Sequence, residues 1–171
     1  ATGAFTRPLS ARTSADIQRN SALEFWIILE YCSFQSLADY WTLGGCVRMD
    51  ENRFFISDIA VGLEYIYKTL RLHHLSLTPA NIYLSRDPAS IFPKAKLANF
   101  GMVDIVSTSN TVPFDLITDS YYAAPECFNF YWHELSDVWS FGILIFKLLV
   151  GLTPYDLLEF TPEEAHFAQI S

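Results

Sequence analysis

The hydrophobic pattern of the chain is clearest in the stretch that follows Asp50. Apolar side chains recur there every three or four residues as far as Leu70, which is the spacing of one face of an α-helix. Asp is also a common residue at the N-terminal cap of a helix. The pattern therefore predicts an amphipathic helix with a core-facing stripe made of Ile56, Ile59, Ala60, Leu63, Ile66, Tyr67 and Leu70.

A second helix is predicted from Ser136 to the stop signal at Gly151, and apolar residues surround it almost completely. A helix of that kind belongs in the middle of a domain. Further on, Thr161 is followed by Pro162 and Glu164. This combination of N-cap, first-turn proline and capping box predicts the start of another helix.

The signals for β-structure are short. The run from Glu24 to Tyr31 is aromatic and β-branched, which is typical of a buried strand. Residues 82–84 and 95–97 are strand-like and flank a loop rich in turn residues, so they predict a small hairpin. A short helix is expected from Leu37. The predicted fold is therefore mainly α (α+β), with a small β element.

Composition narrows the classes of ligand. The 171 residues are 51% hydrophobic and 16% aromatic but only 18% charged, so we expect part of the surface to face a protein partner. The net charge is −8, with 11 Lys and Arg against 19 carboxylates. Nucleic acid and anionic membrane are held chiefly by basic residues, so we predict no nucleic-acid partner and no membrane partner.

Cysteine usage and hydropathy indicate an intracellular, cytoplasmic protein. Cys32, Cys46 and Cys127 are odd in number and lack C-x-x-C spacing, so neither a disulfide framework nor a zinc ribbon is indicated. The longest apolar stretch, residues 139–152, is too short to span a bilayer and contains Lys147.

Four segments, in order along the chain, resemble signature motifs of the protein kinase family. His74-Leu75-Ser76-Leu77-Thr78-Pro79-Ala80-Asn81 resembles the catalytic loop, Asn99-Phe100-Gly101 the metal-binding triplet, Ala124-Pro125-Glu126 the end of the activation segment, and Asp137-Val138-Trp139-Ser140-Phe141-Gly142 the start of the central helix.

The resemblance implies a protein kinase-like C-lobe. It covers most of the chain, so we expect residues 1–23 to be a lead-in or a remnant of the N-lobe. Residues 24–171 would then form the C-lobe, incomplete at its C-terminal end. The first Lys is Lys68, and no G-x-G-x-x-G loop precedes it. The family's N-lobe Lys therefore has no counterpart, and we expect the N-lobe to be truncated or missing.

Several matched positions depart from the family pattern. The catalytic Asp is replaced by Ser76, the metal-binding Asp by Asn99, and a Lys that steadies the transferred phosphate by Thr78. Asn81 matches the family's second metal-binding Asn. Serine is no general base at neutral pH, and neutral amides are weak ligands for Mg²⁺. The resemblance, with these departures, predicts an inactive kinase homologue that is not an enzyme and has no catalytic residues or metal site.

Other matched positions are expected to be structural. His74 and Phe100 match two residues that stack in the family's hydrophobic spine. Asp137 matches the helix residue that ties down the catalytic loop, and Glu126 matches a residue whose usual Arg partner lies further along the chain.

Nucleotide contacts in the family would fall on four residues of this chain. They are Leu29, Glu30, Cys32 and Tyr83. Without an upper lobe the nucleotide pocket would be half open, so no bound cofactor is expected. ATP with Mg²⁺ is the one ligand whose binding should be tested.

We therefore predict a pseudokinase that works as a protein-binding scaffold or allosteric partner in a larger assembly. Residues 78–83 and 120–126 are similar to NIMA-related (NEK) kinases, which points by analogy to cytoskeletal or ciliary assemblies. The alternatives are a weak or partner-completed Ser/Thr protein kinase with residual ATP binding, and a purely structural subunit.

Overall fold

The described part of the chain falls into two compact units. The structure is a computed structural model that describes residues 4–6, 25–42, 49–100, 119–129, 131–132 and 135–165. The units are Ala1–Tyr31 and Cys32–Ser171, and each is considered by itself. The expected domain boundary between residues 23 and 24 stays a prediction.

The first unit contains one pair of short strands. β1 (Ala4–Thr6) and β2 (Phe25–Ile27) are antiparallel, with Ala4 opposite Ile27. The strand expected from Glu24 to Tyr31 is therefore confirmed over three residues only. Its second half has no partner strand among the described residues, and Ile28, Leu29 and Tyr31 are exposed there.

The second unit is built on the amphipathic helix that the sequence predicts. α1 (Leu37–Thr42) precedes α2 (Met49–Tyr65), and a π-helical turn, η1 (Ile66–Leu70), extends α2 to the end of the predicted stripe. Phe55 and Ile59 are fully buried. The predicted helix is confirmed, and its last turn widens into the π form. It begins at Met49, so Asp50 lies inside it and is not its N-cap. The predicted stripe faces the core only in part, because Tyr67 and Leu70 are exposed.

The predicted hairpin packs against α2. β3 (Ile82–Ser85) and β4 (Lys94–Leu97) are antiparallel, with Ile82 opposite Leu97. The Asp58 carboxylate on α2 accepts a hydrogen bond from the backbone N–H of Ala95, at 3.0 Å. This bond joins the helix to the strand beside it.

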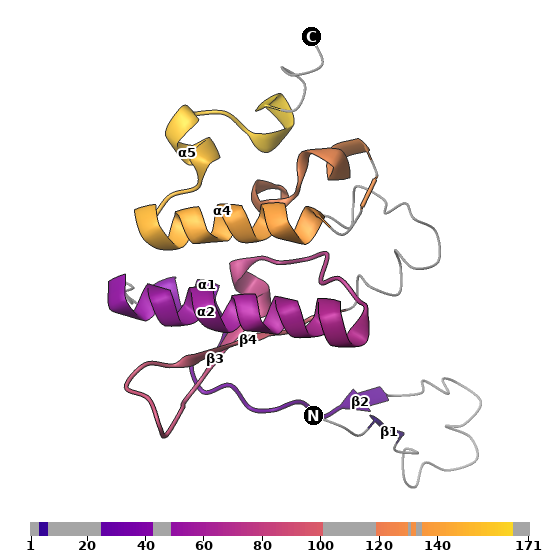
Figure 1. The fold of residues 1–171 in the computed structure, drawn as a ribbon, viewed down its shortest axis with the longest axis vertical. Helices are drawn as coiled ribbons and strands as arrows, with labels where there is room; N and C mark the ends of the chain where they lie inside the picture. The colour runs from indigo at the N-terminus through magenta and orange to yellow at the C-terminus, as the bar shows by residue number, and fades with distance from the viewer. Residues whose placement is uncertain are drawn as a thin grey trace, which may run out of the picture. The chain divides into compact units, whose positions relative to one another are not determined.

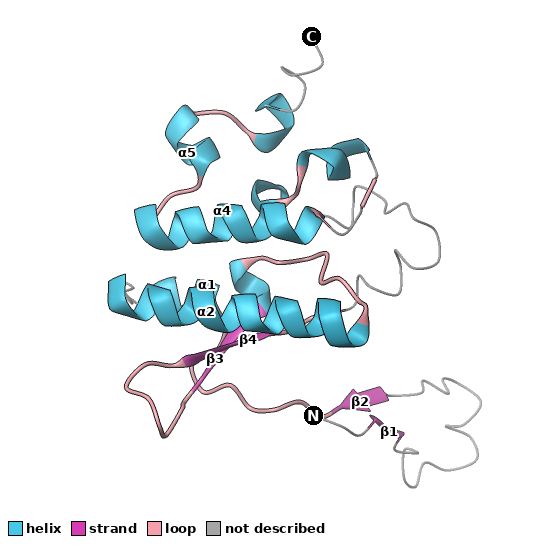
Figure 2. Cartoon of the chain, in the orientation of Figure 1, coloured by secondary structure: helices cyan, strands magenta, loops and turns pink. Residues whose placement is uncertain are grey.

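α4 (Ser136–Val150) forms the layer on the other side of α2 and runs antiparallel to it (Figure 1). It ends at Gly151, whose φ of 89° is the left-handed conformation that favours glycine. The hairpin, α2 and α4 are successive layers (Figure 2). Between the layers lies a core of Leu37, Phe55, Ile59, Leu77, Ile82, Leu84, Ala95, Tyr122, Ile143, Leu144 and Leu148.

Short elements complete the second unit. The 3-10 turns are η2 (Pro79–Asn81), η4 (Ser120–Tyr122) and η5 (Pro125–Asn129), and α5 (Pro154–Leu158) follows α4. The capping box at Thr161 is confirmed, since Thr161 and Glu164 exchange hydrogen bonds at the start of a helical turn, 162–165. None of the described helices has the length and apolar character needed to cross a bilayer.

The prediction that the 136–151 helix lies in the middle of the domain holds only in part among the described residues, although Ile143, Leu144 and Leu148 are in the core. Val138, Trp139, Leu149 and Val150 are exposed, with Val138 at 63%. The helix packs against α2, η4 and α5. These contacts leave part of its apolar surface uncovered.

Two helical glycines give a matched test of this packing. A Cβ at Gly62 of α2 would lie 2.9 Å from Leu97 Cδ1, whereas a Cβ at Gly142 of α4 meets nothing within 4 Å. Gly142→Ala should raise the free energy of unfolding by about 0.5–1 kcal/mol through backbone entropy. Gly62→Ala should lower it by about 1 kcal/mol, because overpacking outweighs that gain. Urea unfolding of both variants would contradict the packing if Gly62→Ala proved as stabilising as Gly142→Ala.

Candidate functional site

The candidate site is the loop of residues 71–81, which joins the end of η1 to β3. Arg71 ends the helix in the left-handed conformation, with φ of 56°. Leu75 is also left-handed, with φ of 61°, an unusual state for a bulky residue that must be held by its surroundings. The loop therefore needs a strong anchor.

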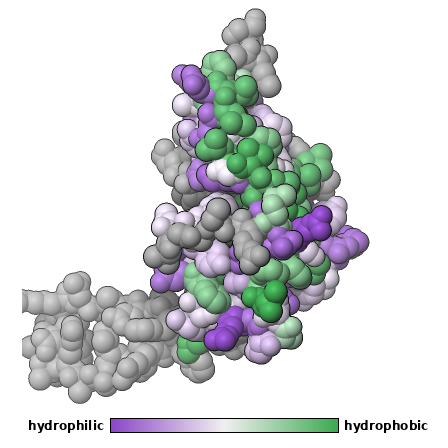
Figure 3. Space-filling model, turned by 90° about the vertical axis from the view of Figure 1, so that its left-hand side faces the viewer, coloured by the Kyte–Doolittle hydropathy of each residue, from purple (hydrophilic) through white to green (hydrophobic). Residues whose placement is uncertain are grey.

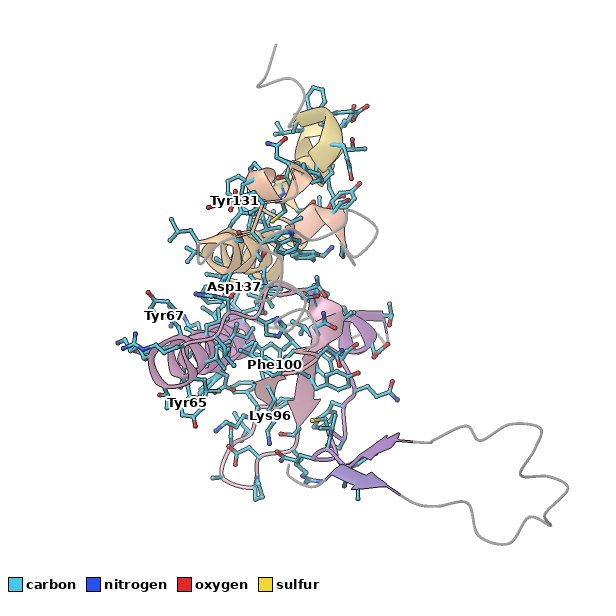
Figure 4. The ribbon with its side chains drawn as sticks, turned by 90° about the vertical axis from the view of Figure 1, so that its right-hand side faces the viewer. Tyr65, Tyr67, Lys96, Phe100, Tyr131 and Asp137 are labelled. Atoms are coloured by element: carbon cyan, nitrogen blue, oxygen red, sulfur yellow. The ribbon has the colours of Figure 1, made fainter. Side chains whose placement is uncertain are left out.

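Asp137 supplies that anchor from the first turn of α4. Its two carboxylate oxygens accept hydrogen bonds from the backbone N–H groups of His74, at 2.6 Å, and Leu75, at 2.7 Å. Asp137 is buried, so these charge-assisted bonds replace the water that its carboxylate has lost. Figure 4 shows Asp137 on the side of α4 that is turned toward α2.

The His74 side chain joins the loop to the segment after β4. The ring is fully buried and its Nε2 lies 3.0 Å from the carbonyl oxygen of Ala98. The backbone N–H of Ser76 donates to Nδ1 over 3.4 Å. Nε2 is then the protonated nitrogen, and the ring is neutral. Burial lowers the pKa of His74, against the opposing effect of the Asp137 charge. Its ring also contacts Phe100, with centroids 4.9 Å apart.

Three of the positions predicted as degenerate form one hydrogen-bonded chain. The Asn81 side-chain amide donates to the carbonyl oxygen of Ser76, at 2.8 Å, and to Ser76 Oγ, at 2.9 Å. The Asn99 amide donates in turn to Asn81 Oδ1, at 2.8 Å. Asn99 has φ of 64°, a conformation that Asn and Asp tolerate better than most residues. The fold thus brings Ser76, Asn81 and Asn99 together.

The side chains of Ser76, Asn81 and Asn99 could contribute oxygen ligands to a metal ion, but they carry no negative charge. The described residues contain no cluster of three or more His, Cys, Asp or Glu side chains able to hold a metal. Mg²⁺ prefers carboxylates and phosphates. The amide oxygens of Asn81 and Asn99 are neutral, and Asn81 Oδ1 already accepts from the Asn99 amide, so any Mg²⁺ would depend on the phosphates of a nucleotide.

The remaining predicted site residues lie around this chain. Thr78 is buried, and its carbonyl oxygen accepts from the backbone N–H of Asn81. Glu126 accepts a hydrogen bond from Ser136 Oγ at 2.8 Å, which links η5 to the first turn of α4. Nothing in the sequence pattern indicates this local partner.

The four nucleotide-contact candidates divide between the two units. Leu29 and Glu30 belong to the first unit and are exposed. Cys32 and Tyr83 belong to the second and are half-buried, with Tyr83 on β3. Their role in binding a nucleotide stays a prediction.

Sequence reasoning missed two polar residues. Ser140 Oγ donates to the carbonyl oxygen of Tyr122, at 2.7 Å, and so holds η4 against α4. Asp119 precedes η4, and its carboxylate accepts from the backbone N–H of Tyr121 at 3.2 Å. The Asp-Ser-Tyr sequence is compatible with such a turn, but only the fold shows what lies beside it.

A cavity of about 750 Å³ adjoins the 71–81 loop. Pro79 and Ala80, which directly precede Asn81, form part of its wall. The rest of the wall comes from α1, the start of α2, the C-terminal end of α4, and Asp119 with Tyr122. Its volume is in the range of ligand pockets, so a peptide side chain has room beside the candidate loop.

The helical layers, the hairpin and a loop anchored by an aspartate define a protein kinase-like domain. The comparisons agree. The protein kinase domain model matches residues 15–169, which is most of the chain. The protein therefore belongs to the protein kinase family.

Three relatives illustrate the range of similarity. A rice serine/threonine protein kinase is 30% identical over 143 residues, covering 78% of this chain and 25% of the relative. A probable serine/threonine-protein kinase of Dictyostelium discoideum is 34% identical over 133 residues, covering 77% and 15%. A mouse protein named an inactive serine/threonine-protein kinase is 27% identical over 131 residues, covering 76% and 21%. The chain spans about a quarter or less of the length of these relatives.

The comparisons correct one prediction. The sequence-based expectation that the chain is not an enzyme is contradicted, because the family match and relatives named as Ser/Thr kinases point to kinase activity. The expectation treated Ser76 and Asn99 as decisive, although one position is not the only possible source of a carboxylate. Family membership also implies ATP and Mg²⁺ as the general ligands of the domain, whereas the NEK relationship is not confirmed.

The neutral, buried His74 predicts a pH dependence of stability. In the unfolded chain its pKa is near 6.5, and burial lowers the pKa in the folded state. The unfolded state therefore binds more protons below pH 6.5. The contribution of His74 to stability is present above that pH and is lost as the pH falls, by at most about 1.4 kcal/mol per pH unit.

Urea unfolding between pH 7.5 and 5.5 checks this prediction. His74→Gln keeps an N–H donor for Ala98 but cannot titrate, so it should flatten the pH dependence. His73→Gln, at the adjacent half-buried position, is the control and should keep the slope. Equal slopes in all three proteins would show that His74 is not the titrating group.

Proposed function

We propose that this chain forms part of a Ser/Thr protein kinase domain that binds ATP weakly and transfers its γ-phosphoryl group to Ser or Thr side chains at a low rate. An N-lobe or a partner protein would raise this low rate further. The single observation that carries the proposal is the hydrogen-bonded chain from Ser76 through Asn81 to Asn99.

Positioning is the main support for residual catalysis. Much of a kinase's rate enhancement comes from holding reactants in line rather than from covalent chemistry. The 71–81 loop is held at His74 and Leu75 by Asp137 and at Asn81 by its own amide. A loop that is fixed before the substrate binds loses little free energy to reorganisation.

The absence of charged side chains in the loop is the reason to expect a low rate of phosphoryl transfer. The loop residues 73–81 contain no Asp, Glu, Lys or Arg, so they supply neither a carboxylate for the metal nor a cation for the phosphate. Electrostatic groups of that kind are each worth on the order of 10²- to 10³-fold in rate. ATP binding and turnover should therefore be weaker than in relatives that carry charged residues in this loop.

Binding to other proteins is the second candidate role, as a scaffold or allosteric partner within a larger assembly. One relative is named an inactive kinase, and large apolar residues are exposed near the end of α4 and on α5. Figure 3 shows this hydrophobic surface over the upper part of the second unit. The exposed residues are Leu149, Val150, Leu152, Leu157, Leu158 and Phe160. A cytoplasmic or cytoskeletal location stays a prediction.

The proposed activity is tested by incubating the purified chain with γ-labelled ATP, Mg²⁺ and a library of Ser/Thr peptides. Label should enter the peptides slowly, but faster than with heat-denatured protein. Asn81→Ala should reduce incorporation to the denatured level, with folding checked by circular dichroism. No incorporation at saturating ATP would refute the proposed activity.

The substitution Asn99→Asp tests whether a carboxylate at this position strengthens the binding of Mg²⁺ and ATP. The substitution adds a carboxylate where the amide now stands, and it removes the N–H that occupies Asn81 Oδ1. The left-handed backbone tolerates either residue. We expect Mg²⁺-dependent ATP binding to tighten by roughly tenfold or more, seen as a larger ATP-induced rise in the melting temperature.

Asn129→Asp is the matched control for that measurement. It adds the same charge on η5 at an exposed position and should leave the ATP-induced shift unchanged. If Asn99→Asp behaved like this control, Asn99 would not lie at a metal-nucleotide site.

A further inference from the structure

The proposed reaction needs a proton acceptor that the 71–81 loop does not carry. A Ser or Thr hydroxyl must lose its proton as it attacks phosphorus, and kinases use a carboxylate to accept it. Ser76 cannot do so at neutral pH. If the proposed function holds, the acceptor must come from another part of the fold.

Most nearby titratable groups are already occupied. Asp137 uses both oxygens on the backbone of the loop. His74 is fully buried with both ring nitrogens engaged. Glu126 accepts from Ser136 Oγ. None of these described groups is placed to reach a substrate hydroxyl.

Asp119 lies on the wall of the cavity beside the loop. Pro79 and Ala80, immediately before Asn81, line the same cavity. Asp119 stands just before η4, and the Ser140 hydroxyl fixes η4 against α4 through the carbonyl oxygen of Tyr122. Asp119 therefore belongs to a supported turn and lines a space large enough for a substrate side chain.

The Asp119 carboxylate retains the capacity to accept a proton. Its Oδ1 accepts from the backbone N–H of Tyr121, and no described residue donates to Oδ2. Burial raises the pKa of Asp119, while the Tyr121 N–H and the Lys147 charge act to lower it. Lys147, also on the cavity wall, favours the ionised form. An ionised carboxylate with raised basicity suits a general base.

We infer that Asp119 is the general base of this chain, accepting the proton of a Ser or Thr hydroxyl that enters the cavity beside Pro79 and Ala80. This inference rests on the proposed kinase function and adds a catalytic residue to it. It would supply the proposed activity with a proton acceptor in a chain whose catalytic-loop equivalent has Ser76 where the family has Asp.

Atoms and electrons balance in this transfer. The substrate hydroxyl oxygen forms a bond to the γ-phosphorus of ATP, and the bond between that phosphorus and the β,γ-bridging oxygen breaks. The bridging oxygen keeps the electron pair and leaves as part of ADP. The hydroxyl proton passes to the Asp119 carboxylate, directly or through one water molecule, and is then released to solvent.

Asp119→Asn is the first test, because the amide still accepts from the Tyr121 N–H but cannot take up a proton. In the labelled-ATP assay kcat should fall by about 10²-fold or more, with little change in the KM for ATP. Asp87→Asn is the matched control. Asp87 also accepts from the backbone N–H two residues on, that of Ala89, but it lies in the β3–β4 loop. The activity of this control should equal that of the unsubstituted chain.

A double-mutant cycle separates a catalytic role from a structural one. Ser76→Asp places a carboxylate in the loop itself, so it should raise kcat and make Asp119 dispensable. Asp119→Asn in that background should then cost less than about threefold, although alone it costs about 100-fold. Equal losses in both backgrounds would mean that Asp119 only supports the fold and would overturn the inference.

The outcomes also distinguish the proposed kinase function from the assignment of Asp119 as its general base. If the unsubstituted chain incorporates no label, the proposed function fails. If it incorporates label and Asp119→Asn matches Asp87→Asn, the function stands and the assignment of Asp119 fails.

Discussion

The carboxylate of Asp137 is the interaction on which the rest of the site depends. It holds two successive backbone N–H groups of a loop in which Leu75 is left-handed. Without it, the strained Leu75 backbone would lose its charged partner, and the loop would be held by packing and by the remaining hydrogen bonds of His74 and Asn81. Hydrogen bonds to a charged group contribute about 1.5–3 kcal/mol each, which is enough to offset the backbone strain of such a residue. Because Asp137 stands on α4, the loop geometry depends on the central helix as well as on the loop's own residues, such as Asn81.

The helices and the hairpin that form the layers can be predicted from the sequence pattern. The stripe that ends at Leu70 predicts α2, because burial on one face imposes helical spacing on the apolar residues. Gly151 marks the end of α4 and turn residues mark the hairpin, because these backbone conformations restrict which residues can occupy them. The strand after Glu24 is harder to delimit, since a run of apolar residues does not specify which of them find a partner strand. The exposure of Val138 and Trp139 is hidden for the same reason: hydropathy does not say which surfaces other elements cover.

Only part of the candidate site can be predicted from the sequence. Resemblance to the family identifies His74, Asn81 and Asp137, but the hydrogen bond between the amides of Asn81 and Asn99 joins residues 18 apart and requires the fold. The Ser136–Glu126 bond is likewise tertiary. Asp119 belongs to none of the four motifs by which the chain resembles the family. Only the cavity that it shares with Pro79 and Ala80 draws attention to it. The expectation of an inactive protein arose because a motif fixes which residue stands at a position, whereas chemistry requires only that a group of the right kind lie within reach.

How much activity the site can support depends on which groups lie within reach of the reactants, and not only on which residue stands at each motif position. A general base contributes on the order of 10²- to 10⁴-fold in rate, whereas positioning of the reactants can lower the barrier by about 7–11 kcal/mol. Under the proposed function, a chain with an anchored loop keeps the rate enhancement that comes from positioning, and the inferred base, Asp119, lies on a neighbouring turn instead of in the loop. The charge at the metal position is a different matter, because Asn99 and Asn81 leave Mg²⁺ to be held by the nucleotide. If the proposed function holds, weak ATP binding, more than the absence of a base in the loop, is the constraint that limits the reaction.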